Sequence, residues 1–146
     1  MPTAVSADPT AIANRLRPAL LRLNRELRRE IHSLGVNGGQ VTLLIQIGRE
    51  PGIGVNELAA RERMSAPGMS KAIGRLEAAG LLRRTELADK RRVGLELTDE
   101  GERVLASVKR RRTAWLADRL RGLTPRELDK IDDAIEPMLR LLEVDA

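Results

Sequence analysis

The segment from Asp89 to Gly101 constrains the fold of this chain more than any other. It opens with four consecutive charged residues and then alternates apolar with other residues, so that one face carries Val93, Leu95 and Leu97. Such alternation predicts a half-buried β-strand, and Thr98 follows it as a candidate N-cap for a helix. Upstream, a helical pattern over residues 65–79 ends at Gly80. A helix, a hairpin with a basic tip and a second helix together predict a winged helix-turn-helix, which is typical of DNA-binding proteins.

The charge supports this interpretation through its distribution rather than its total. The 146 residues include 26 basic and 21 acidic ones, a net charge of +5. Residues 61–92 carry nine basic and four acidic side chains, whereas residues 123–146 carry three basic and seven acidic ones. The positive charge therefore concentrates on the predicted helix and wing, where a phosphate backbone would be met.

Several classes of function are disfavoured by what the chain lacks. It has no cysteine and one histidine, His32, so neither a disulfide framework nor a metal site is expected, and no cofactor is predicted. No nucleophile with a base and no glycine-rich phosphate loop is apparent, which argues against an enzyme. No apolar run approaches the roughly 18 residues of a membrane span. Residues 1–8 lack the layout of a signal peptide, so we expect a cytoplasmic protein without membrane contact.

Long amphipathic helices are predicted near both ends of the chain. The first begins after Asp8 as N-cap and follows an apolar stripe to Leu34, with a kink expected at Pro18. The last begins at a capping signature on Thr124. A compact winged helix needs neither, so a second copy of the chain is expected to cover both stripes; alternatively, the two helices cover each other within a monomer. The candidate interface residues are Leu16, Leu20, Leu128, Ile131, Ile135 and Leu139.

The predicted fold is mainly α with a small β-wing, in three parts. Residues 1–36 form an N-terminal dimerisation helix, residues 37–100 the winged helix-turn-helix, and residues 101–146 the C-terminal dimerisation helices. Within the last part, the basic run Lys109–Arg112 is expected to face solvent, with pairing to the acidic last helix as the alternative.

Three stretches resemble the MarR family of bacterial transcription regulators. They are Glu57-Leu58-Ala59, the segment from Met64 to Gly80 followed by Leu81-Leu82-Arg83-Arg84, and the Asp89-x-Arg91 wing followed by Leu97-Thr98-x-x-Gly101. The resemblance implies a homodimer joined through its first and last helices, a pseudo-palindromic operator in double-stranded DNA, and repression that a small-molecule effector relieves. Together with the basic wing it favours DNA binding over the alternative, a winged-helix module that works through protein contacts alone.

The resemblance also supplies the candidate site residues. Arg91 would enter the minor groove, and Asp89 would hold an arginine of the wing in place rather than touch DNA. The remaining candidates for DNA contact lie on the recognition helix, the first strand and the wing tip: Ser65, Gly68, Met69, Ser70, Lys71, Arg75, Arg84, Lys90 and Arg92. Two of them depart from the family pattern, because Gly68 stands where a hydroxyl residue is common and Lys71 where arginine is common.

Each of these assignments has a simpler alternative. A charged wing tip can be a solvated turn, and Ser70 and Lys71 can be ordinary surface residues. Arg83 and Arg84 occupy adjacent strand positions, so their side chains point to opposite faces and one of them is expected to face DNA. Trp115 and His32 are candidates for the edge of an effector pocket, although the apolar stripe favours Trp115 as a core residue.

Overall fold

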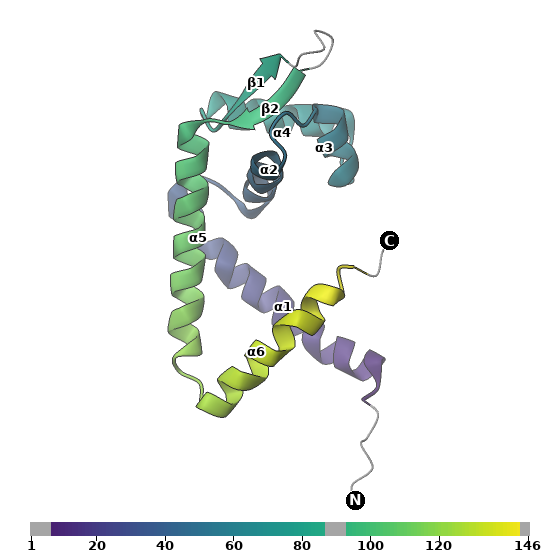
Figure 1. Ribbon diagram of the computed structural model, residues 1–146, viewed down its shortest axis with the longest axis vertical. Helices are drawn as coiled ribbons and strands as arrows, with labels where there is room; N and C mark the ends of the chain where they lie inside the picture. The colour runs from purple at the N-terminus through teal and green to yellow at the C-terminus, as the bar shows by residue number, and fades with distance from the viewer. Residues whose placement is uncertain (1–6, 87–92, 144–146) are drawn as a thin grey trace, which may run out of the picture.

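The computed structural model describes residues 7–86 and 93–143, which are mostly helical with one small β-hairpin (Figure 1). The elements in chain order are α1 (Pro9–Arg29), a 3₁₀ turn η1 (His32–Leu34), α2 (Gly38–Arg49), α3 (Val55–Arg61), α4 (Ala66–Ala78), β1 (Leu82–Glu86), β2 (Val93–Leu97), α5 (Asp99–Leu120) and α6 (Pro125–Arg140). The predicted fold class is confirmed. The predicted wing tip, with Asp89, Lys90, Arg91 and Arg92, lies outside the described residues.

Side-chain caps set the starts of most helices, as their sequences predict. Asp8, Asn37, Ser65, Thr98 and Thr124 each accept hydrogen bonds from backbone N–H groups in the first turn of the helix that follows. At α2 and α6 the cap is reciprocal, because Gln40 and Glu127 return a side-chain bond to the N-cap amide. Such bonds join residues only two or three positions apart, so they are readable from the sequence.

The first helix is shorter than its apolar stripe predicted. It continues through Pro18 but ends at Arg29, and the chain then turns through η1 to Gly35, whose φ of 77° is a left-handed conformation suited to glycine. Ile31 is fully buried against the winged lobe, while Leu34 is half-buried. The last residues of the predicted stripe thus belong to a turn that anchors α1 to the lobe.

The apolar core lies in the winged lobe, which comprises α2, α3, α4 and the hairpin. Leu44 and Ile47 of α2, Leu58 of α3 and Ile73 and Leu76 of α4 are all fully buried. Apart from the hairpin strands, in which Leu82 pairs with Leu97 and Glu86 with Val93, the loop before α3 adds one antiparallel bridge between Ile53 and Leu95.

That bridge corrects the simple alternation predicted for the second strand. Leu95 is fully buried and Leu97 half-buried, but Val93 is 47% exposed because it lies at the outer end of the hairpin. Gly94, predicted on the other face, is buried, and a Cβ there would meet the Gly52 carbonyl oxygen at 2.7 Å. The glycine therefore lets the loop before α3 lie directly on the wing.

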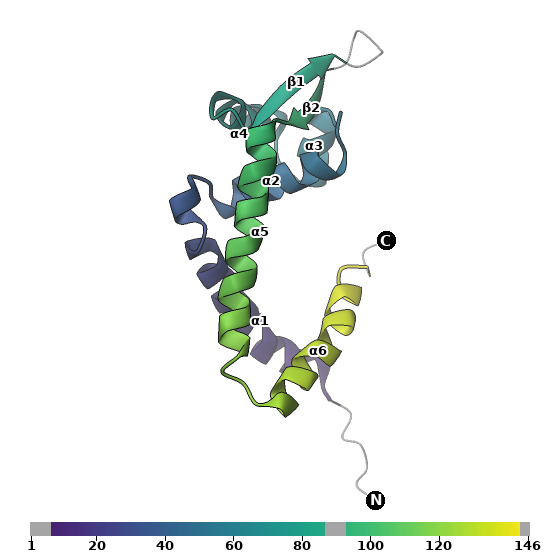
Figure 2. The same ribbon diagram turned by 60° about the vertical axis from the view of Figure 1, so that its left-hand side comes forward.

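Helix α5 connects the winged lobe to the other end of the molecule (Figure 2). At its start, the Thr98 hydroxyl donates to the Gly80 carbonyl oxygen at 2.6 Å, and the Thr98 amide donates to Leu81 at 3.2 Å. Gly101 is buried against the Leu81 carbonyl. At the far end, α6 turns back from α5 towards the side on which α1 lies (Figures 1 and 2). Of the helices described, none is long and apolar enough to cross a membrane.

Candidate nucleic-acid interface

The exposed face of α4 contains most of the residues that the sequence assigned to DNA. Ser70, Lys71 and Arg75 are all exposed. They lie beside the buried positions Met69, Ile73 and Leu76, whose spacing of four and three residues follows the inner face of the helix. The helix therefore presents a polar, basic face to solvent while its apolar face holds it in the core.

Met69 is not a DNA-contacting residue, and that assignment was wrong. Its side chain has no exposed surface and belongs to the core cluster. The neighbouring Ser70 is exposed because consecutive helical residues are rotated by about 100°. Met69 positions the helix from below, and Ser70 is the residue available to a ligand above.

Ser65 and Gly68 form one local unit at the start of α4. The Ser65 hydroxyl oxygen accepts a hydrogen bond from the Gly68 amide at 3.1 Å, which caps the helix. A Cβ on Gly68 would stand 2.9 Å from that oxygen. The glycine thus accommodates the cap, and it offers backbone rather than a side chain to any base.

Arg83 and Arg84 have partners on different elements. Arg83 pairs with Glu96, directly opposite it on β2. Arg84 approaches Glu77 of α4, with 3.4 Å between Nε and Oε1. Adjacent strand residues point to opposite faces, which accounts for the two different partners. Arg84 therefore links the first wing strand to the helix that carries Ser70 and Lys71.

The start of α2 lies beside the same face of the lobe. A hollow of about 320 Å³ separates it from α4. The hollow is lined by Asn37, Gly39, Gln40, Thr42, Leu43, Glu62, Met64, Ala72 and Arg75. The capping box at Asn37 signalled the helix start, but its position next to Arg75 depends on how two helices pack and was not predicted.

Trp115 and His32 do not form one pocket edge. Trp115 is half-buried in a hollow of about 590 Å³ between η1 and α5, and the Arg119 guanidinium lies 5.3 Å from its ring centre. The other lining residues are Glu30, Leu34, Ser107, Arg110, Arg111, Ala114 and Asp118. His32 is exposed and is not among them. Neither a pure core residue nor a pocket shared with His32 describes Trp115.

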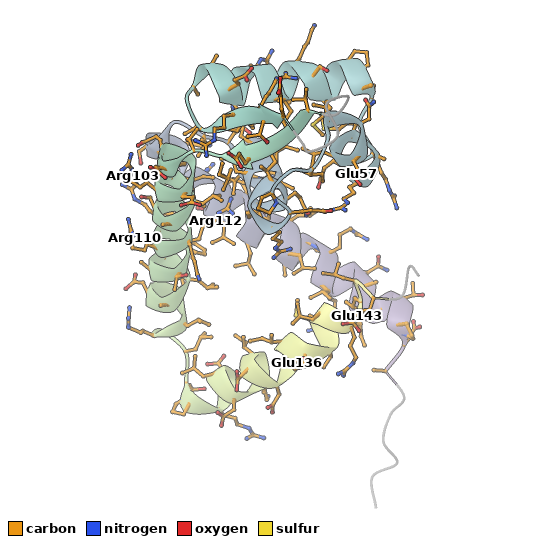
Figure 3. The ribbon with its side chains drawn as sticks, turned by 45° about the horizontal axis from the view of Figure 1, so that its top comes forward. Glu57, Arg103, Arg110, Arg112, Glu136 and Glu143 are labelled. Atoms are coloured by element: carbon orange, nitrogen blue, oxygen red, sulfur yellow. The ribbon has the colours of Figure 1, made fainter. Side chains whose placement is uncertain are left out.

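The basic run Lys109–Arg112 does not face solvent as a whole. Arg112 projects from the side of α5 that faces α2, while Arg103 and Arg110 project from its outer side (Figure 3). The Arg112 Nε atom is buried without a hydrogen-bond partner among the described residues. Desolvation, with the nearby positive charge of Arg28, lowers the pKa of Arg112. A hollow of about 460 Å³ adjoins it, lined by Val41, Ile45, Arg49, Leu105, Ala106, Val108, Lys109 and Thr113.

The apolar stripes of α1 and α6 remain largely uncovered in the single chain. Neither helix contains a buried residue in the part that the structure describes. Leu16 is half-buried, whereas the five other predicted interface residues are between 37% and 50% exposed: Leu20, Leu128, Ile131, Ile135 and Leu139. The alternative that α1 and α6 bury each other within one monomer is therefore wrong.

This arrangement defines a winged helix-turn-helix protein, and comparison with known proteins identifies its family. Residues 34–92 match the model of the MarR family. The uncharacterized HTH-type transcriptional regulator Mb0904 of Mycobacterium bovis is 32% identical over 133 residues, covering 90% of this chain and 93% of that protein. This chain belongs to the MarR family, and it is a DNA-binding transcription regulator.

Solved structures agree over nearly the full length. A putative transcriptional regulator from Pseudomonas aeruginosa is 30% identical, with a TM-score of 0.82 and coverage of 99% of this chain and 100% of that one. The regulator Tm0710 from Thermotoga maritima is 26% identical, with a TM-score of 0.75 and coverage of 92% and 95%. The similarity therefore includes α1, α5 and α6 as well as the winged lobe.

Proposed function

We propose that this protein acts as a homodimeric repressor on a pseudo-palindromic operator. The exposed face of α4 carries the proposal, because Ser70, Lys71 and Arg75 project from a helix whose other face is locked into the core. In a two-fold dimer the two copies of α4 would enter successive major grooves about 34 Å apart. Ser70 and Lys71 would read base edges, and Arg75 would contact a phosphate.

The exposed stripes of α1 and α6 support the homodimer. They leave large apolar residues in contact with water in the single chain, and such contiguous patches mark interaction surfaces. A second copy presents the same two stripes, so one self-complementary interface covers all of them.

The test is selection of duplex DNA from a random pool, followed by titration with matched lysine variants. Lys71→Ala removes a basic side chain from α4, and the control Lys130→Ala makes the same change on α6. We expect wild type to enrich an inverted repeat, and Lys71→Ala to weaken its binding by roughly tenfold or more. Lys130→Ala should bind like wild type. Arg91→Ala, run in parallel, tests the wing that the resemblance assigns to the minor groove.

The salt dependence adds a second readout. If Lys71 contacts a phosphate in both half-sites, its removal lowers the slope of log K against log salt by about 1.8. If it reads a base, the slope changes little while the sequence preference relaxes. No enriched sequence, with equal weak binding by both lysine variants, would overturn operator recognition and favour the protein-interaction module.

Relief of repression by a small molecule is part of the same proposal. The hollow beside Trp115 lies between η1, which anchors α1, and α5, which carries the dimer end. A ligand there would favour one spacing of the two lobes over another. Trp115 is the only tryptophan of a chain without tyrosine, so its fluorescence reports occupancy directly. A compound that releases DNA without changing this emission would place the effector elsewhere.

A further inference from the structure

One flank of the α6 stripe is acidic. At about 100° per residue, Asp132 and Glu136 lie on the same side of Ile135, about 60° and 100° around the helix. Asp129 lies on that side before them, and Glu143 continues the row just beyond the helix end. All four carboxylates are exposed. Figure 3 labels Glu136 and Glu143 on this element.

The flanks of the α1 stripe differ in charge. Measured from Leu20 in the same rotational sense, Arg17 and Arg28 lie about 60° and 80° around the helix. On the opposite flank, Glu26 and Glu30 lie at about the same angles or slightly more. Each helix therefore has a defined charged side next to its apolar stripe.

These charges are not neutralised within the chain. Among the residues that the structure describes, no ion pair includes an acid of α6, and none includes Arg17 or Arg28. Arg17 donates a hydrogen bond only to Asn14, at 3.3 Å. Arg28 extends over Gly38, and its neighbouring charge is that of Arg112, which has the same sign.

The handedness of the α-helix decides which flanks can meet. When two right-handed helices pack stripe to stripe in antiparallel directions, flanks on the same rotational side face each other; in parallel directions, opposite flanks do. Antiparallel packing of α1 on α6 therefore brings Arg17 and Arg28 against the acidic row. Parallel packing would bring Glu26 and Glu30 against that row, with like charges opposed.

The lengths also agree. Arg17 and Arg28 are eleven residues apart, which is about 16 Å along a helix. The acidic row from Asp129 to Glu143 extends over about 21 Å at the same rise per residue. One row is thus long enough to face both arginines at once.

We propose that α1 of one copy packs antiparallel on α6 of a second copy, with Arg17 and Arg28 paired to the acidic row, and that this pairing sets the orientation of the dimer. The inference rests on the proposed homodimer and adds what selects its geometry. The apolar stripes supply most of the affinity. The charged flanks exclude the parallel alternative, which the stripes alone would tolerate.

Reciprocal charge reversal tests the pairing. The first variant carries Arg17→Glu and Arg28→Glu, and the second carries Asp132→Lys and Glu136→Lys. Alone, each should raise the dimer Kd roughly 10- to 100-fold, measured by sedimentation equilibrium, because a two-fold interface contains every pair twice. An equimolar mixture should form heterodimers with a Kd close to that of wild type, since both of its helix contacts are again complementary.

A matched control reverses charges on the far sides of the same helices. Arg22→Glu with Asp133→Lys changes two exposed residues that lie about 160° from the stripes, so the dimer Kd should stay at the wild-type value. Arg17→Glu alone is a second test, because Arg17 has no contact with the winged lobe that could disturb folding. Raising salt should weaken the wild-type dimer and strengthen each reversed homodimer.

The outcomes are distinct. A wild type that stays monomeric would remove the proposed homodimer itself. A wild-type dimer whose reversed variants dimerise normally, or whose mixture fails to recover, would overturn the charge pairing and leave the homodimer intact.

Discussion

Replacing Gly101 with alanine should destabilise the fold, although alanine is the better helix former. Gly101 lies in the first turn of α5, where its amide donates to the Thr98 hydroxyl oxygen at 3.0 Å. A Cβ at this position would stand 2.1 Å from the Leu81 carbonyl oxygen and 3.1 Å from its carbon. Because both partners are backbone, the contact can be relieved only by moving α5 away from the lobe.

The magnitude follows from opposing effects. Forcing an extra methyl group into a packed site costs about 1–3 kcal/mol. The required shift also weakens the bonds from Thr98 to Gly80 and Leu81, each worth about 0.5–1.5 kcal/mol. Alanine returns about 0.5–1 kcal/mol through its lower chain entropy in the unfolded state. We expect a net loss of about 2–4 kcal/mol in the free energy of unfolding.

Urea denaturation at fixed protein concentration, followed by circular dichroism, measures this loss, with Gly74→Ala as the matched control. Gly74 lies inside α4, and nothing stands within 4 Å of a Cβ built there. The same substitution should therefore stabilise the protein by about 0.5–1 kcal/mol. If Gly101→Ala were neutral or stabilising, the close approach of α5 to Leu81 would not exist as described.

Three further predictions follow from the contacts. Ser65→Ala should lower the free energy of unfolding by about 1 kcal/mol because it removes the α4 cap, as urea titration can measure. Arg84→Ala should lower it by less than about 1 kcal/mol in the same assay, because the pair with Glu77 is exposed. Hydrogen bonding at the α6 cap lowers the pKa of Glu127, so its ionised form stabilises the fold above the ordinary value of 4.5. Wild type should therefore unfold at a higher temperature than Glu127→Gln at neutral pH, and this difference should disappear as the pH falls through the lowered pKa.

Local signals made most of the fold predictable. The N-caps act over two or three residues, and the apolar stripes of the helices repeat within one turn, so both are visible in the sequence. The bridge between Ile53 and Leu95 was not visible, because it joins residues more than forty positions apart. The end of α1 at Arg29 was missed because Ile31 and Leu34 continue its apolar stripe although they belong to the following turn.

The errors at the site arose where a motif or a run outweighed helical geometry. Met69 was assigned to DNA with its neighbours, although its spacing to Ile73 and Leu76 already placed it on the buried face. Arg112 was grouped with an exposed basic run, although it lies four residues after the buried Val108 and so shares its face. Four consecutive helical residues cannot all face solvent on a helix with one buried side.

The hollows were beyond the reach of sequence. Each is bounded by elements that are distant in the chain, and its shape depends on how η1, α2 and α5 pack. Trp115 and His32 were grouped because both lie near the first and fifth helices. Only the turn at residues 32–34 decides that Trp115 lines the hollow and His32 does not.

Helix α5 makes the dimer end and the DNA-binding face mechanically dependent on each other. Its 22 residues form a rod about 33 Å long. Gly101 fixes one end of this rod to the winged lobe, and α6 follows at the other end. With the dimer end held, a rotation of about 10° at the far junction would displace the lobe by about 6 Å, a large fraction of a spacing of about 34 Å between successive grooves. Changes in the packing of α1 on α6 should therefore alter operator affinity even though neither helix touches DNA, and the orientation selected by the charged flanks is a condition for recognition.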